Sequence, residues 1–330
     1  MFTAYVRGLK TGNMQVYKNL AMLPLLSDAS SEVAYLLLDE ALDKHLIEVT
    51  ELTEGGHVPE LKVINKSDTM VLLLDGEELV GAKQNRIINT TILIAAKSTI
   101  IIPVSCVEQG RWSYVSNKFS SCKRVMSSDM RARKADQVYA SRKARGTYHS
   151  DQSAIWNEIS RKAVHFETHS PTMAMSDIYL QEQGSIDEYR KHFSTADRQV
   201  GALFLINGRV AGLDSFSSTD TLAKMFGKLV DSYALDAMEW LQPDCEIKIS
   251  DDTAQKYLDS ILSARIELTN SVALGSDLRL NSPVVTGFAL IYETTILHLS
   301  AFARKNGQEE APEYRRMHRF SQRRSNRKEA

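Results

Sequence analysis

Hydrophobic and polar positions follow two kinds of pattern in the first third of the chain. Residues 32–48 place apolar side chains roughly on one helical face, which predicts a short amphipathic helix. A continuous apolar run at 70–74 follows, and then two runs rich in β-branched residues at 86–95 and 99–107. Polar turn residues separate these runs. The pattern is typical of an antiparallel β-meander that is buried on at least one face.

The second half of the chain alternates between helical and strand patterns. Asn207-Gly208 separates two apolar runs and favours the type I′ turn of a β-hairpin, because both residues accept a positive φ. Thr219 is placed to cap a long amphipathic helix that ends near Leu241. The remaining patterns predict helices at 151–166, 173–192 and 252–268 and strands at 270–280, 283–292 and 295–302.

Together these elements predict an α+β fold. Its first part is an antiparallel meander with flanking helices, and its C-terminal half holds a β-hairpin and a long helix. We divide the chain into a β-rich part at 1–116, a basic exposed loop or frayed helix at 117–150, an α+β part at 151–303 that packs with the first as one unit, and a basic polar tail at 304–330. The basic loop or the tail could contact a protein partner or another polyanion.

Composition limits the classes of function. The 330 residues carry a formal net charge of -1, which argues against a bulk nucleic-acid binder. Cys106, Cys122 and Cys245 are widely spaced, as in proteins of a reducing compartment. No apolar run approaches the roughly 18 residues that span a bilayer, and residues 1–9 lack the pattern of a secretory signal. The sequence therefore predicts a cytoplasmic protein without a membrane segment.

Polar residues gather where the predicted strands of the meander begin and end. The run 70–74 leads into Asp75, the next strand begins at Arg86, and the return strand ends near Val107, so we expect these points at one edge of the sheet. The candidate site at this edge comprises Asp75, Glu77, Glu78, Gln84, Asn85, Arg86, Cys106, Glu108, Arg111 and Trp112.

The residue types at this edge suit a phosphorylated nucleotide or sugar. Glu77, Glu78 and Glu108 are candidates for acid–base catalysis or, with Asp75, for holding a divalent cation. Cys106 is a weaker candidate for a nucleophile because no histidine lies near it in the sequence. The ligand-binding candidates are Arg86 and Arg111 for phosphate, Gln84, Asn85 and Trp112 for ribose and base, and Asp75.

Plainer interpretations stay open at this stage. The same glutamates and Arg86 could form only a surface ion-pair network, and Trp112 could be a core or rim aromatic. His165 and His169 have the i, i+4 spacing of a metal pair, but no zinc-protease glutamate follows His165, and Pro171 indicates that the helix is ending. We therefore predict no metal ligand from the histidines.

Two segments resemble a known family. They are Leu-Leu-Asp-Gly-Glu-Glu-Leu-Val-Gly-Ala-Lys-Gln-Asn-Arg at 73–86 and Ile-Pro-Val-Ser-Cys-Val-Glu-Gln-Gly-Arg-Trp at 102–112. The chain resembles the "ARG and Rhodanese-Phosphatase-superfamily-associated protein" domain, in which ARG denotes ADP-ribosylglycohydrolase, from about Leu23 to Leu299. The resemblance implies ADP-ribose- or NAD-linked metabolism and transfers no catalytic residue.

Residues and resemblance together predict a protein that binds a phosphorylated nucleotide-type ligand. As an enzyme it would hydrolyse or transfer an ADP-ribose- or NAD-derived substrate. The alternatives are a non-catalytic sensor or adaptor for an ADP-ribose-type ligand, and a structural interaction protein in which the polar edge is only a salt-bridged rim.

Overall fold

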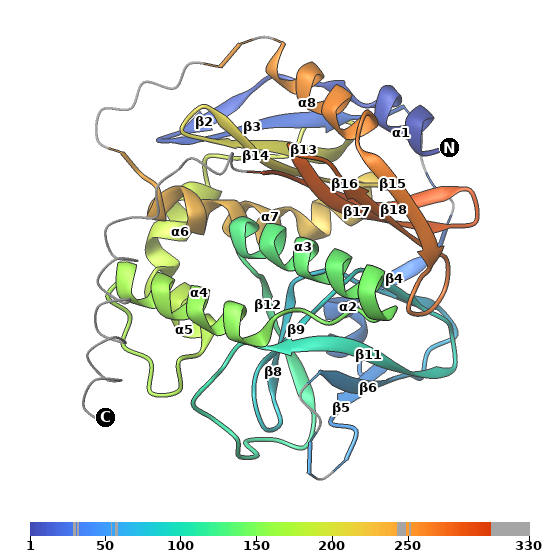
Figure 1. The fold of residues 1–330 in the computed structure, drawn as a ribbon, viewed down its shortest axis with the longest axis vertical. Helices are drawn as coiled ribbons and strands as arrows, with labels where there is room; N and C mark the ends of the chain where they lie inside the picture. The colour runs from blue at the N-terminus through green and yellow to red at the C-terminus, as the bar shows by residue number, and fades with distance from the viewer. Residues whose placement is uncertain are drawn as a thin grey trace.

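Three β-sheets and the helices packed on them make up the described part of the chain in this computed structural model (Figure 1). The described residues are 1–28, 31, 33–53, 55–56, 59–242, 249–250 and 252–304. Helices and strands are both abundant, and the strands pair almost entirely in antiparallel fashion, so the expected α+β class is confirmed.

The largest sheet combines the N-terminal strands with the C-terminal half of the chain. Its order is β1-β3-β13-β14-β18-β17-β16-β15, with β2 paired to β3. The predicted hairpin is β13–β14, and Asn207 and Gly208 adopt the positive φ values of 51° and 74° that the turn requires. The strands are β1 (Lys10–Thr11), β2 (Gln15–Tyr17), β3 (Leu20–Leu26), β13 (Gln199–Ile206), β14 (Arg209–Phe216), β15 (Arg265–Asn270), β16 (Ser276–Asn281), β17 (Val285–Tyr292) and β18 (Thr295–Ala303).

The predicted meander forms two smaller sheets. One has the order β12-β8-β9-β11-β6-β5, and the other has the order β10-β7-β4, in which β4 and β7 are parallel. The strands are β4 (Tyr35–Leu37), β5 (Ile47–Thr50), β6 (Glu60–Asn65), β7 (Met70–Leu73), β8 (Glu77–Gly81), β9 (Arg86–Ile88), β10 (Ile92–Ile94), β11 (Ser98–Cys106) and β12 (Phe119–Val125).

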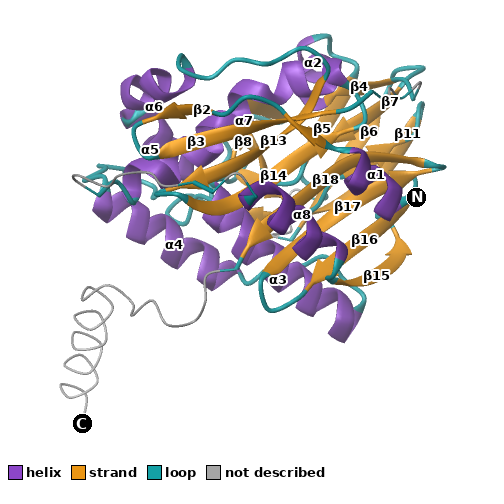
Figure 2. Cartoon of the chain, turned by 90° about the horizontal axis from the view of Figure 1, so that it is seen from above, coloured by secondary structure: helices purple, strands orange, loops and turns teal. Residues whose placement is uncertain are grey.

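Helices cover both faces of the large sheet and separate it from the six-stranded sheet (Figures 1 and 2). On the outer face, α1 and α8 pack on an apolar core that includes Leu203, Ile261 and Leu299. On the inner face, α7 contacts β13 and β14, and α3 contacts β17 and β18. The helices are α1 (Phe2–Gly8), α2 (Leu38–Asp43), α3 (Ser128–Arg145), α4 (Gln152–His165), α5 (Met175–Gln181), α6 (Gln183–Arg190), α7 (Thr219–Glu239) and α8 (Thr253–Leu262).

Several predicted elements differ in detail. The run 86–95 is two strands, because β9 pairs with β8 and β11 whereas β10 leaves to pair with β7. Residues 32–48 form β4, α2 and β5 instead of one helix. Ser218, one position before the predicted cap, accepts the capping hydrogen bond of α7 from the backbone of Thr221.

The basic segment 117–150 was expected to be an exposed loop or frayed helix, and the exposed interpretation is wrong for most of it. It contains β12 and the 18-residue helix α3. The inner face of α3 buries Arg131 and Lys134 completely. The predicted basic tail lies, apart from Arg304, outside the described residues. No helix in the described ranges is long and apolar enough to cross a membrane.

Candidate functional site

Strands β9 and β11 bring one part of the predicted site to one end of β9, namely Gln84, Asn85, Arg86, Cys106, Glu108, Arg111 and Trp112. The expectation that the residues after 70–74 lie at the same edge is wrong for Asp75 and Glu77: the unpredicted strand β8 runs antiparallel to β9 and places them at the other end, beside Ile88. Arg86 pairs with Leu79 on one side and with Cys106 on the other, so the start of β9 lies between the other two strands. Gln84 and Asn85 occupy the turn before β9, and Glu108, Arg111 and Trp112 follow the end of β11. The ten residues therefore do not form one cluster, and their side chains form separate groups with different partners.

The carboxylates of Asp75 and Glu77 take part in interior ion pairs. Asp75 accepts hydrogen bonds from Lys134 and, at 3.4 Å, from Arg131, both on α3. Glu77 lies 2.7 Å from the ammonium of Lys228 on α7. Because both acids are buried and neutralised by lysines, they tie the strand ends to the two central helices and are poorly placed to bind a ligand.

Glu108 and Arg111 form a closed clamp around the 82–85 turn. The Arg111 guanidinium donates to both oxygens of Glu108, at 2.8 and 2.6 Å, and Glu108 also accepts from the backbone of Asn85 at 3.0 Å. The other Arg111 donors bond to Ala82, Ser113, Gly81 and Asn85. Burial would raise the pKa of Glu108, but hydrogen bonding by Arg111 lowers it below its ordinary value. Every nitrogen of Arg111 is therefore occupied.

Arg86 is a buried arginine whose guanidinium has fewer hydrogen-bond partners than donors among the described residues. It is fully buried, and Nη1 donates to Gln84 Oε1 at 3.0 Å. Its Nε and Nη2 have no hydrogen-bond partner among the described residues, and the carboxylate of Glu51 forms an ion pair with it at 3.7 Å from Nη2. The exposed ring of Trp112 lies over the guanidinium, 5.7 Å from its carbon. We call Glu51, Gln84, Arg86, Cys106 and Trp112 the Arg86 cluster.

Cys106 belongs to the Arg86 cluster as a thiol. Its Sγ donates to the same Gln84 oxygen that Arg86 contacts, at 3.0 Å. Burial raises the pKa of Cys106, although Arg86 opposes the shift. Gln152 on α4 holds the Cys106 backbone through two hydrogen bonds of 2.8 and 2.7 Å. The sulfur is thus protonated at neutral pH and does not have the properties of an activated nucleophile.

Glu78 differs from the other carboxylates of the site. It is fully buried, and neither oxygen has a hydrogen-bond partner of normal geometry within the described ranges. Its polar neighbours include Cys122 and Asn85, with Arg124 as a nearby cation. Burial raises the pKa of Glu78 to about 8, so this carboxyl keeps its proton at neutral pH. A buried neutral carboxyl can donate a proton or a hydrogen bond.

Two residues of the site were not predicted from the sequence. Glu51 follows β5, a strand that the sequence pattern did not reveal, and it reaches Arg86 from 35 positions away in the chain. Gln152 stands at the start of α4, in a further segment that resembles the family, 150–152, but the sequence pattern indicated no role for it in the site. The contacts of both residues depend on tertiary packing, which local patterns do not report.

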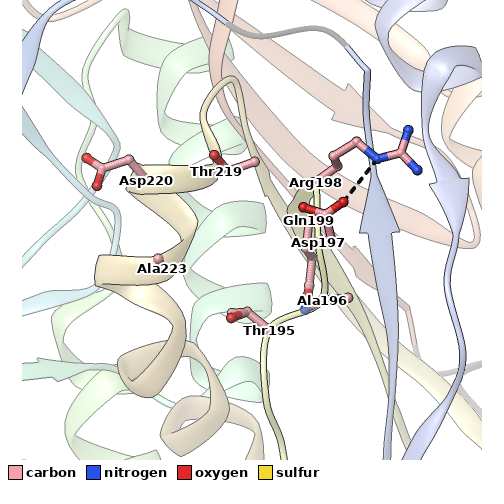
Figure 3. Close-up of a pocket in the computed structure, with 8 residues that line it drawn as sticks. All are labelled: Thr195, Ala196, Asp197, Arg198, Gln199, Thr219, Asp220 and Ala223. Atoms are coloured by element: carbon pink, nitrogen blue, oxygen red, sulfur yellow. Dashed lines mark hydrogen bonds and ion pairs between the residues drawn. The ribbon is translucent and has the colours of Figure 1, made fainter.

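Other features considered as sites offer fewer groups that could bind a ligand or a metal ion. A hollow of about 440 Å³ lies between residues 195–199 and the start of α7, and Figure 3 shows the side chains of Asp220 and Arg198 directed away from the space between them. His165 and His169 are exposed. Within the described ranges, no group of three His, Cys, Asp or Glu side chains is placed to hold a metal ion.

Residues 8–302 match one known family, described as the ARG and Rhodanese-Phosphatase-superfamily-associated Protein domain. The match includes both segments on which the resemblance rested, 73–86 and 102–112. No curated protein and no solved structure matches the chain.

Proposed function

The chain belongs to the ARG and Rhodanese-Phosphatase-superfamily-associated Protein domain family, and we propose that it binds a phosphorylated, nucleotide-type ligand of ADP-ribose- or NAD-linked metabolism at the Arg86 cluster. The family name supports only the metabolic setting. The location and the chemical class of the ligand rest on the side chains of the cluster.

The observation that carries the proposal is the incomplete hydrogen bonding of Arg86. Buried polar groups in folded proteins almost always have partners, because an unpaired buried donor costs about 1–3 kcal/mol. Here two adjacent nitrogens of one guanidinium, Nε and Nη2, lack hydrogen bonds among the described residues. These nitrogens form the edge that binds a phosphate or carboxylate through two parallel hydrogen bonds. A phosphate oxygen pair would satisfy both.

The aromatic neighbour of Arg86 suits the rest of a nucleotide. Trp112 is 47% exposed although it lies against a buried cation. Lys83 approaches the same ring to 5.3 Å and the neighbouring Tyr114 ring to 5.0 Å. An exposed indole held in place by cations is a platform on which a base can stack, and such stacking contributes about 1–3 kcal/mol per base.

Glu51 gives the proposal a distinctive consequence. Its carboxylate lies near Arg86 but forms no hydrogen bond with it, so it neutralises the guanidinium without occupying its donors. An incoming phosphate would have to overcome repulsion by Glu51. We therefore expect Glu51→Gln to tighten binding, whereas a purely structural Arg86–Glu51 pair would only lose stability.

The test compares ligands of different size with matched variants. Isothermal calorimetry with ADP-ribose should give saturable binding to the wild-type protein. Arg86→Lys keeps the charge but loses the pair of parallel N–H donors. It should weaken binding of ADP-ribose and ribose 5-phosphate at least tenfold, or about 1.4 kcal/mol. Trp112→Ala should weaken the binding of ADP-ribose but not that of ribose 5-phosphate, which has no base. Lys256→Ala, a surface cation on α8, serves as the control.

Absence of binding would contradict the proposal. If folded wild-type protein binds none of ADP-ribose, NAD, AMP and ribose 5-phosphate at millimolar concentration, with and without Mg²⁺, the Arg86 cluster is a structural ion pair. Equal losses in Arg86→Lys and Lys256→Ala would place any binding elsewhere.

A second candidate function, hydrolysis or transfer of the bound ligand, rests on Glu78. Of the four residues considered for catalysis, Glu77 and Glu108 are paired with cations and Cys106 is a protonated thiol. Glu78 is a fully buried carboxyl with no cation in hydrogen-bonding contact among the described residues, and its pKa of about 8 leaves it a proton to donate at neutral pH. Chromatography after incubation separates the possibilities: an enzyme forms product, and Glu78→Gln abolishes it while binding persists. A sensor returns the ligand unchanged.

A further inference from the structure

A small basic hollow lies far along the chain from the Arg86 cluster, between the end of α3 and the edge of the large sheet. Its volume is about 50 Å³, and it is lined by Tyr139, Arg142, Lys143, Glu267, Thr269 and Arg279. These residues come from α3, β15 and β16. Three cations and one carboxylate therefore surround a space that holds a few water molecules.

Arg279 forms the buried wall of the hollow and has an unused donor. Its Nε donates to Asp277 at 2.8 Å and its Nη2 to Thr90 at 2.7 Å. Its Nη1 has no hydrogen-bond partner in the described part of the chain, although the side chain is almost completely buried. The rings of Tyr148 and Phe288 lie near the guanidinium, but contacts with ring faces do not satisfy an N–H group in the guanidinium plane.

The two cations at the mouth of the hollow are not neutralised by carboxylates. Arg142 donates to the carbonyl of Gly146 at 3.1 Å and to the hydroxyl of Thr269, both uncharged acceptors. Lys143 is exposed, and within the described ranges no ion pair involves it. The one carboxylate of the lining, Glu267, already accepts from Tyr139 at 2.8 Å and pairs with Arg265 at 3.2 Å.

We propose that this hollow binds a phosphate group, either as inorganic phosphate or as the terminal group of a phosphomonoester. A dianion would accept a hydrogen bond from the unused Nη1 of Arg279 and would be attracted by the positive charges of Arg142 and Lys143. The volume admits one tetrahedral oxyanion and excludes a nucleoside. The site shares no lining residue with the Arg86 cluster, so it stands whether or not the function proposed there is correct.

The experiment uses the complete chain and inorganic phosphate as the probe. Calorimetry and thermal shift are measured against sodium chloride of equal ionic strength, because screening alone changes stability. The double variant Arg142→Gln, Lys143→Gln removes the half-buried cation and the exposed cation of the hollow and should weaken phosphate binding at least tenfold. The control Arg145→Gln, Lys256→Gln removes the same charge outside the hollow and should bind like the wild type.

Two further variants make the result specific. Glu267→Gln should strengthen phosphate binding at least threefold, because it removes the one negative charge of the lining. Arg86→Lys should leave it unchanged, which separates this site from the Arg86 cluster. Phenyl phosphate distinguishes the source: equal binding indicates a terminal phosphomonoester, and binding of inorganic phosphate alone indicates the free ion.

Three results would overturn the proposal. They are no saturable effect of phosphate beyond that of chloride, full retention of binding in the Arg142→Gln, Lys143→Gln variant, and equal weakening by the control pair.

Discussion

Substitution of Asp214 tests whether the buried charges at the centre of the molecule hold the large sheet and the six-stranded sheet together. Asp214 lies on β14 and accepts from Arg131 at 3.0 and 2.6 Å, from Ser300 at 2.7 Å and from Tyr233 at 3.1 Å. Arg131 also reaches Asp75 in the turn before β8. Asp214→Asn keeps the shape and part of the hydrogen bonding but removes the charge opposite Arg131.

The expected cost follows from what remains around Arg131. The guanidinium would stay buried, and its ion pair with Asp75 would remain, at 3.4 Å and with Asp75 already paired with Lys134. Breaking a buried pair by removing one partner costs about 3–5 kcal/mol. Because Asp75 compensates partly, we expect the lower end, about 3 kcal/mol. Burial would raise the pKa of Asp214, but Arg131 holds it well below its ordinary value, which is consistent with a strong pair.

Urea unfolding at pH 7, followed by circular dichroism, measures this cost as a loss in the free energy of unfolding. Asp197→Asn is the matched control, since that exposed acid lies 3.6 Å from Arg198, and its loss should change the free energy by less than about 0.5 kcal/mol. The double variant Asp214→Asn, Arg131→Met should cost at least about 2 kcal/mol less than the sum of the single variants. A cost below about 1 kcal/mol for Asp214→Asn, or additive behaviour, would refute the reasoning.

Two further predictions concern stability. Glu78 titrates near 8 in the fold against an ordinary value of 4.5, so between these pH values the folded state holds the extra proton and the free energy of unfolding falls as pH rises. The free energy of unfolding of Glu78→Gln should therefore rise relative to that of the wild type by about 1 kcal/mol per pH unit from pH 5 to 8, as measured by urea unfolding. Parallel dependences of the two free energies on pH would contradict this. Gly287→Ala should lower the free energy of unfolding by at least about 2 kcal/mol, because its Cβ would lie 2.4 Å from the Ser300 carbonyl oxygen. In Gly184→Ala, on α6, the new Cβ meets nothing within 4 Å, so this variant should raise the free energy of unfolding by about 0.5 kcal/mol. Equal urea midpoints for the two alanine variants would contradict the second prediction.

The elements predicted best from the sequence are those with local causes. Asn207-Gly208 forms its hairpin because the turn needs two positive φ values and these residues supply them. The helix α7 follows from its apolar face and its capping residue. In contrast, residues 32–48 have a helical pattern but split, since β4 pairs with β7 and β5 pairs with β6. Tertiary strand pairing overrides the local preference there.

The segment around α3 shows why composition misled the prediction. Its many basic residues favour an exposed loop when they are considered alone. The acids that neutralise Arg131, however, lie 56 and 83 positions away, at Asp75 and Asp214. A buried arginine cannot be told from an exposed one until those partners are known. The sequence brought Arg86 and Cys106 together correctly, but it missed β8, which moves Asp75 and Glu77 to the other end of β9, and it could not assign each carboxylate to its partner.

Among the described residues, three arginines are buried, and their hydrogen bonds differ in a way that bears on function. Arg131 uses all of its nitrogens on Asp75, Asp214 and Ser300, as expected of a charge buried for stability. Arg86 and Arg279 each keep donors for which the described residues offer no partner. All three lie beside an aromatic ring, Trp112 for Arg86, Tyr148 for Arg279 and Phe302 for Arg131, so the unused donors are what distinguish Arg86 and Arg279.

A buried arginine with unused donors is destabilising unless another group completes its hydrogen bonds. If Arg86 and Arg279 were structural like Arg131, replacing either one with methionine would cost less than replacing Arg131, because fewer hydrogen bonds would be lost. If they are anion sites, the same replacements also remove ligand binding, and pairing them with Glu51→Gln or Asp277→Asn, which neutralises the buried acid left without its arginine, keeps the unliganded protein nearly as stable. Binding and stability should therefore separate at Arg86 and Arg279, whereas substitution of Arg131 should affect the fold first.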